Sequence, residues 1–148
     1  MLRLAPIAIA LTFGLFTATP AFAQSEEAVY ESIESIHGDA DGFFEVFSLL
    51  QDAMMFGDPL TLAAYAAYPL TVNANGEVYD VLEEQDLVDN FDALLTPETQ
   101  AAIASQDVGD LIVTSEGVGI GDGVLWISNI CLDDACSDTV WQIIAIIN

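Results

Sequence analysis

The sequence has almost no cationic side chains. Its 148 residues include one Lys or Arg, which is Arg3, and one histidine, against 24 Asp and Glu, so the formal net charge at pH 7 is −23. A nucleic-acid-binding surface needs Lys or Arg to neutralise phosphates, and this composition excludes that function. Stabilisation of an oxyanion or phosphoryl group by Arg or Lys is excluded for the same reason. Two explanations of the acidity stay open: adaptation to a saline habitat and attraction of a cationic partner.

Arg3 lies in a segment that we predict to be removed. Residues 1–23 combine this basic residue, a short apolar run and the sequence Ala21-Phe22-Ala23, which is the pattern of a secretory signal peptide. Thr and Pro residues interrupt the run, so a membrane anchor is not favoured. We expect cleavage after Ala23, a single domain over residues 24–148, a periplasmic (Gram-negative) or secreted location, and no stable membrane insertion of the mature protein.

The sequence has two cysteines, Cys131 and Cys136, in the segment CLDDAC. Export to an oxidising compartment makes a disulfide the expected state. A zinc site would need more Cys or His ligands, and a redox pair is more often spaced C-x-x-C. We therefore predict a structural disulfide that closes a short loop.

Four glycines occur within seven residues of the stretch EGVGIGDGVLW, which ends at Trp126. A dinucleotide fingerprint, G-x-G-x-x-G, would place its third glycine on Asp122 or Val124, and a P-loop would need a lysine. The residues that follow are typical of a strand and not of a helix start. We therefore predict a β-hairpin turn at residues 121–123 and no phosphate-binding loop.

No cofactor and no metal site is predicted. The segment HGDADGFFE resembles the centre of a calcium loop, but His37 and Ser48 stand where an EF-hand has an Asp and a bidentate Glu. We interpret the segment as an acidic turn that starts a helix. The single histidine leaves little material for a Ser-His-Asp triad. Acid–base catalysis by a buried carboxylate together with a tyrosine stays open, so the sequence does not decide whether the protein is an enzyme.

The chain pattern predicts helices first and strands last, with one hairpin between. Phe43, Phe47, Leu50 and Met54 follow helical spacing and should form one buried stripe. Asp58-Pro59 and Thr96-Pro97 are helix-start signals, and Gly57 is a stop. The predicted helices cover residues 24–36 (with Val29, Ile33 and Ile36 on one side), 41–56, 59–67, 83–95 (with Leu87, Phe91 and Leu94 or Leu95 in a stripe) and 97–104, and the predicted strands cover 70–72, 78–81, 111–115, 124–131 and 139–147. This order favours an α+β fold with a mainly antiparallel, strongly bent sheet packed on N-terminal helices.

Four segments carry a resemblance to a known family: FGDPLTLAAYAAYPLTV (56–72), LVDNFDALLTPETQAAI (87–103), EGVGIGDGVLWI (116–127) and the terminal IIAIIN (143–148). In these segments the chain resembles the nuclear transport factor 2-like superfamily, the cone-shaped α+β fold shared with ketosteroid isomerases, and more closely its small exported bacterial members. The resemblance implies a curved sheet and helices that enclose a pocket open at one end. No catalytic residue carries over from it.

The pocket candidates are aromatic and acidic residues near the predicted hairpin and the last strands: Tyr65, Tyr68, Tyr79, Asp80 and Trp126, with Asp86 as a further candidate carboxylate. We expect an exported, non-catalytic envelope protein that binds a small molecule or a protein partner through this pocket or its acidic surface. The alternatives are an acid–base enzyme of the isomerase or dehydratase kind, and an inhibitor or immunity-like protein that binds a basic partner. A homo-oligomer is left open.

Overall fold

A computed structural model describes residues 24–148, so the predicted signal peptide lies outside the described residues. Helices dominate the first part of the chain and strands the last part. The elements are α1 (Glu26–His37), α2 (Ala40–Phe56), α3 (Pro59–Ala64), β1 (Ala66–Ala74), β2 (Glu77–Val81), α4 (Glu84–Asp89), α5 (Phe91–Leu94), α6 (Pro97–Ala104), the 3-10 helix η1 (Val108–Asp110), β3 (Ile112–Val113), β4 (Val118–Ile120), β5 (Leu125–Cys131) and β6 (Thr139–Ile147).

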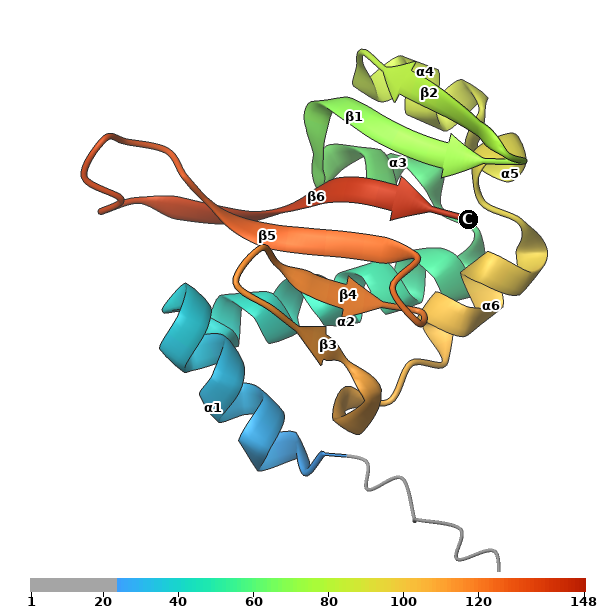
Figure 1. The fold of residues 1–148 in the computed structure, drawn as a ribbon. Helices are drawn as coiled ribbons and strands as arrows, with labels where there is room; N and C mark the ends of the chain where they lie inside the picture. Colours follow the sequence, from blue (N-terminus) through green and yellow to red (C-terminus); the bar gives the residue numbers. More distant parts are fainter. Residues whose placement is uncertain (1–23) are drawn as a thin grey trace, which may run out of the picture.

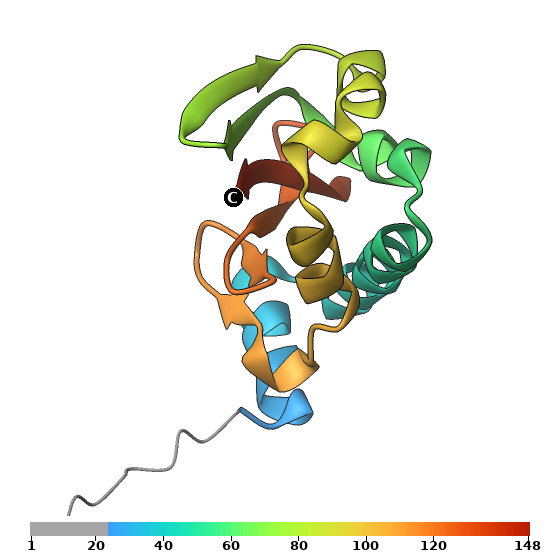
Figure 2. The ribbon, with the colours of Figure 1, turned by 90° about the vertical axis from the view of Figure 1, so that its right-hand side faces the viewer.

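The six strands form one open sheet in the order β2-β1-β6-β5-β4-β3. β1 and β6 run parallel, and the other neighbouring strands are antiparallel. In Figure 1 the sheet descends from β2 at the top to β3 at the bottom, and Figure 2 shows α2 and α3 on one side of it. The predicted α+β class is confirmed, with a mixed sheet.

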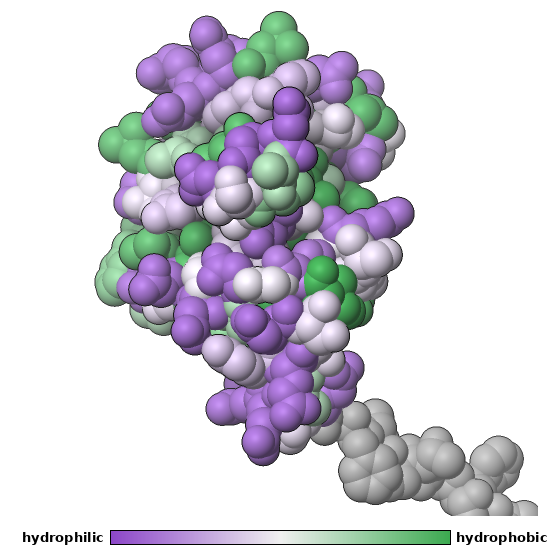
Figure 3. Space-filling view, turned by 90° about the vertical axis from the view of Figure 1, so that its left-hand side faces the viewer, coloured by the Kyte–Doolittle hydropathy of each residue, from purple (hydrophilic) through white to green (hydrophobic). Residues whose placement is uncertain are grey.

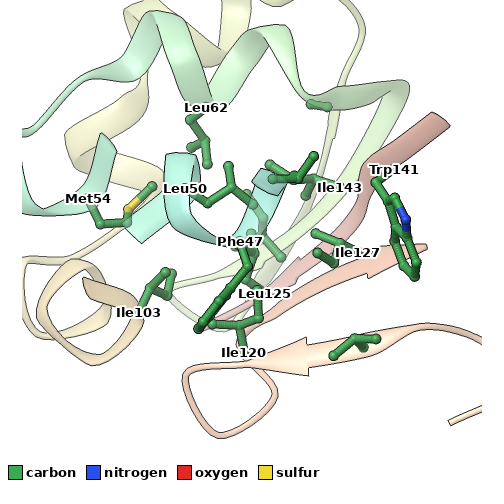
Figure 4. Packing of buried hydrophobic residues seen from close by; sticks show 14 of the residues in the cluster. Phe47, Leu50, Met54, Leu62, Ile103, Ile120, Leu125, Ile127, Trp141 and Ile143 are labelled. Atoms are coloured by element: carbon green, nitrogen blue, oxygen red, sulfur yellow. The ribbon is translucent and has the colours of Figure 1, made fainter. Parts of the chain in front are cut away.

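The core lies between this sheet and α2. The predicted stripe of α2 is buried, since Phe43, Phe47, Leu50 and Met54 are each at most 4% exposed. Figure 4 shows three of these side chains directed towards residues of the central strands and of α6. The labelled partners there are Ile103, Ile120, Leu125, Ile127, Trp141 and Ile143. Burial of this continuous apolar surface holds the helices on the sheet.

The predicted helix boundaries between α2 and α3 and before α6 are confirmed. Gly57 follows α2 in the left-handed conformation at φ 63°. The side chain of Asp58 accepts hydrogen bonds from the backbone N–H groups of Leu60 and Thr61, and Thr96 caps α6. Both caps are followed by proline at the first helical position, as the sequence predicted.

The helix predicted over residues 59–67 is too long, and the strand predicted from residue 70 starts too late. α3 ends at Ala64, and β1 already begins at Ala66, where it pairs with Ile143 of β6. The backbone N–H of Ile143 donates to the carbonyl of Tyr65 at 2.8 Å. Pairing with β6 therefore satisfies the backbone hydrogen-bonding groups of this segment. Pro69 has no backbone N–H to donate, and this is tolerated because Pro69 lies within a register shift between β1 and β6.

The helix predicted over residues 83–95 divides at Asn90 into α4 and α5. The Asn90 side-chain amide donates to the backbone carbonyl of Asp86 at 2.8 Å, so it competes for a helical backbone group. The predicted stripe is still buried, because Leu87, Phe91 and Leu94 are at most 6% exposed. In α1 the stripe is shorter than predicted, since Val29 and Ile33 are buried but Ile36 is 49% exposed.

The end of the chain holds four strands where the sequence predicted three. β4 lies inside the glycine-rich stretch, β3 has two residues, and β6 has the predicted bounds. β4 was missed because glycine is depleted in strands. Gly119 of β4 leaves room for a neighbouring ring, since a Cβ there would lie 3.2 Å from the Trp126 side chain and 3.3 Å from Ile112.

Candidate functional site

The glycine-rich stretch forms the predicted turn. Gly121, Asp122 and Gly123 all have positive φ, at 63°, 58° and 86°, between β4 and β5. The backbone N–H of Gly121 donates to the side-chain carbonyl of Gln106 at 2.8 Å, and the indole N–H of Trp126 donates to the carbonyl of Gly123 at 2.8 Å. The turn is thus tied into the fold, and its carboxylate at Asp122 would repel a phosphate.

The calcium-like segment is the junction between α1 and α2, as predicted. The Asp39 carboxylate caps α2 by accepting from the N–H of Gly42 at 3.0 Å, and it also accepts from the indole N–H of Trp141 at 3.2 Å. Nε2 of His37 contacts the carbonyl of Thr114 at 2.9 Å, so this nitrogen is engaged with backbone. Among residues 24–148, no three His, Cys, Asp or Glu side chains are grouped to hold a metal ion.

The disulfide between Cys131 and Cys136 is present, as predicted, with the two Cα atoms 4.7 Å apart. It closes an exposed loop between β5 and β6. Within this loop the Asp133 carboxylate accepts from the N–H and the hydroxyl of Ser137, and these bonds hold the pKa of Asp133 below its usual range. The loop is a solvated turn that is closed by its own contacts.

Tyr65 and Tyr68, two of the pocket candidates, are half-buried and pack against the core. The Tyr68 hydroxyl donates to the carbonyl of Ala63 at 2.9 Å. Burial, with a smaller contribution from the charge of Glu84, raises the pKa of Tyr68 to about 12. Both the packing and the hydrogen bond give Tyr68 a structural role.

Tyr79 and Asp80 both contribute to the lining of a surface cavity that we call the β2–α4 groove. Its volume is about 480 Å³, and it is lined by Asn75, Tyr79, Asp80, Val81, Leu82, Asp86, Asn90, Ala93 and Leu94. The side-chain amide of Asn75 donates to the carbonyl of Ala93 at 3.3 Å and so links the hairpin turn to α5. Asn75, Asn90 and the residues of α5 were not predicted as lining; the NANG turn was a sequence signal for Asn75 alone.

The β2–α4 groove combines apolar walls with unneutralised acids. Val81 and Leu94 are buried in the core beneath it, whereas Asp80 and Asp86 are exposed. Neither carboxylate has a cationic side chain to pair with, because residues 24–148 contain no Lys or Arg. The Tyr79 hydroxyl donates to the Glu77 carboxylate at 2.8 Å, and this bond raises the pKa of Tyr79. Such a groove suits a cation that also carries an apolar group.

Trp126 lies in a different place, on the sheet face opposite the core, because it stands between the buried residues Leu125 and Ile127 in β5. There it lines a groove of about 310 Å³ with Glu116, Ile144, Ala145 and Ile147. The five candidate residues therefore occupy three sites: the core beside α3, the β2–α4 groove and the open sheet face. Asp80, Tyr79 and the further candidate Asp86 are the ones that the structure brings together.

Hydrophilic and apolar residues are interspersed on the face of the molecule that Figure 3 presents. Figure 3 shows purple residues over most of the face that it presents, with green residues between them. Within residues 24–148 no helix has both the length and the apolar composition needed to cross a bilayer. In comparisons with known proteins, no family model, no curated protein and no solved structure matches this chain.

Proposed function

We propose that this chain is an exported, non-catalytic protein that binds a cationic ligand or partner in the β2–α4 groove. The observation that carries the proposal is the coincidence of Asp80 and Asp86 at one apolar-lined cavity in a domain without Lys or Arg. An ordinary surface acid has cationic neighbours that reduce its field. Here every described carboxylate adds to the same negative potential, and the groove offers an apolar contact as well.

The strength of this attraction follows from Coulomb's law. Two unit charges 4 Å apart interact with about 1 kcal/mol in bulk water and about 4 kcal/mol at the effective dielectric of a protein surface. Salt reduces the interaction over a Debye length of about 8 Å at physiological ionic strength. A cation in the groove would therefore be held mainly by its nearest carboxylates, and its apolar part would add contact with Leu82 and Leu94.

Binding is favoured over acid–base catalysis because the described chain has no buried charged or polar residue. An isomerase-like base needs a carboxylate in an apolar site that raises its pKa, and Asp80 and Asp86 are both exposed. The tyrosine with the most strongly raised pKa, Tyr68, donates its hydroxyl to backbone. These observations support a binding protein, and they apply equally to a small cation and to a basic protein.

We also propose that the fold belongs to the nuclear transport factor 2-like superfamily and that the protein acts in the periplasm or outside the cell. The α+β order, with helices on one face of an open sheet, supports the first proposal. The Cys131–Cys136 disulfide supports the second, because disulfides persist in oxidising compartments.

The test uses phenethylammonium, a cation with an apolar ring, and its neutral analogue 2-phenylethanol. We expect NMR shifts at Tyr79 and Ala93 with the cation and weak or no shifts with the alcohol. The double variant Asp80→Asn/Asp86→Asn should raise the dissociation constant about three- to tenfold, as expected for exposed charge pairs. The matched control is Asp107→Asn/Asp110→Asn, which removes the same charge at η1. Equal binding of both compounds, or equal losses in both variants, would overturn the proposal.

A further inference from the structure

β2 ends the sheet, and its outer edge has no partner strand among the described residues. Figure 2 shows this strand at the margin of the molecule. Natural edge strands are usually protected by charged side chains, especially lysine, by proline, by a bulge or by very short length, and the only charges in β2 are the acids Glu77 and Asp80. β3, at the opposite edge, has two residues, whereas β2 has five and contains neither lysine nor proline. β2 is therefore the edge that can accept another strand.

The hairpin geometry identifies the backbone groups that are free to pair. The turn residues Asn75 and Gly76 have φ values of 56° and 78°, which fit a two-residue type I′ turn. The residues that flank such a turn, Ala74 and Glu77, form a hydrogen-bonded pair. Because the pattern alternates along an antiparallel ladder, the N–H and C=O groups of Val78 and Asp80 point to the outer edge.

The surroundings of this edge are acidic on both faces. Glu77 and Asp80 lie three positions apart in the strand, so their side chains leave opposite faces. α4 and the residue before it add Glu83, Glu84 and Asp86, all exposed. Apolar side chains alternate with these acids: Val78 is 68% exposed, Tyr79 38% and Leu82 67%. The matching strand would carry basic residues on both faces, with apolar residues between them.

We propose that the partner of this site is a basic polypeptide segment that pairs as an additional strand with β2 and places a Lys or Arg side chain in the β2–α4 groove. The inference rests on the proposed function and specifies its ligand. Backbone hydrogen bonds to Val78 and Asp80 would provide affinity, and Asp80 and Asp86 would select the cationic side chain. A small cation could use the groove but not the edge, and this difference makes the inference testable.

The first experiment compares two short synthetic peptides of alternating lysine and valine, one of them N-methylated at its central residues. N-methylation keeps the charge and the side chains but removes the N–H donors. We expect the unmodified peptide to bind in calorimetry and the N-methylated peptide to bind at least about tenfold more weakly. In hydrogen exchange, the amides of Val78 and Asp80 should become protected on binding, whereas Tyr79, which already faces β1, should change little.

The second experiment changes the protein edge. Val78→Pro removes an outward N–H, and proline is tolerated in edge strands at such positions. We expect this substitution to weaken binding of the unmodified peptide at least about tenfold and to leave phenethylammonium binding unchanged. Val78→Thr, which keeps the N–H, is the matched control and should bind as the wild type does.

The outcomes separate the two proposals. Equal binding of the two peptides, or binding without protection of Val78 and Asp80, overturns strand pairing and leaves the cation site intact if phenethylammonium still binds. Failure of both the peptide and phenethylammonium overturns both proposals. Peptide binding that is weakened by Val78→Pro but unchanged by Asp80→Asn/Asp86→Asn supports strand pairing and overturns the role of the two acids.

Discussion

The substitution Gly117→Ala tests how closely the glycine-rich stretch approaches β5. A Cβ at residue 117 would lie 2.5 Å from the carbonyl oxygen of Ile127 and 3.3 Å from its carbon. Since non-bonded heavy atoms prefer about 3.5–4.0 Å, the strands would have to separate by several tenths of an ångström or more. The obstacle is backbone of a strand paired on both sides, which cannot move without disturbing β4 and β6. Overpacking of this kind costs about 1–3 kcal/mol, and the rigid neighbour favours the upper half of that range.

Gly119→Ala is the matched control for this prediction. Its Cβ would meet the Trp126 ring at 3.2 Å and the Cβ of Ile112 at 3.3 Å, and a shift of a few tenths of an ångström relieves both contacts. We expect it to cost less than about 1 kcal/mol. Urea unfolding followed by tryptophan fluorescence measures both losses, because Trp126 and Trp141 lie in β5 and β6. A Gly117→Ala variant as stable as the wild type, or less affected than Gly119→Ala, would show that the close approach to Ile127 is not present.

Two further predictions concern salt and pH. The thermal midpoint of the mature domain should rise as NaCl increases from tens of millimolar towards molar, because 24 carboxylates repel one another and screening shortens the Debye length to about 3 Å at 1 M; a flat or falling midpoint would show that repulsion does not limit stability. The pKa of Tyr68 is about 12, above its ordinary value of 10.0, so the stability gained by its neutral form is complete below pH 10 and is lost as pH rises towards 12. Absorbance at 295 nm follows the ionisation of tyrosine, so a titration of the wild type should contain a step near pH 12 from Tyr68. This step should be absent in Tyr68→Phe and present in Tyr65→Phe.

Sequence patterns predicted the elements whose causes are local. Asp58-Pro59, Thr96-Pro97 and Gly57 set helix ends through contacts within a few residues, and the structure has all three. The stripe from Phe43 to Met54 is equally local, because helical spacing alone puts these residues on one face. The disulfide followed from the close spacing of two cysteines in a chain expected to be exported.

The errors occurred where distant parts of the chain decide the outcome. Ala66 has helical neighbours in sequence but becomes a strand residue because β6, more than seventy residues later, pairs with it. β4 escaped prediction because Gly119 supplies space for Trp126 of the next strand, and strand propensity does not include such packing. The same limit applies to the candidate site. Tyr79 and Asp80 could be suggested from the hairpin, but the contribution of α5 depends on the Asn75–Ala93 contact, which spans 18 residues.

The two explanations of the acidity differ in where the charge should matter, and not in its total. Adaptation to salt requires many dispersed carboxylates, and any one of them can be replaced at small cost. Recognition of a cation requires particular carboxylates beside an apolar surface and an accessible edge, which is the arrangement of Asp80 and Asp86 next to β2. No described carboxylate is buried and none has an internal cation, so a bound cation would gain attraction and would also relieve repulsion among its neighbours. The paired Asn variants at the groove and at η1 change the net charge equally, and a difference between them in ligand binding therefore reports recognition and not habitat.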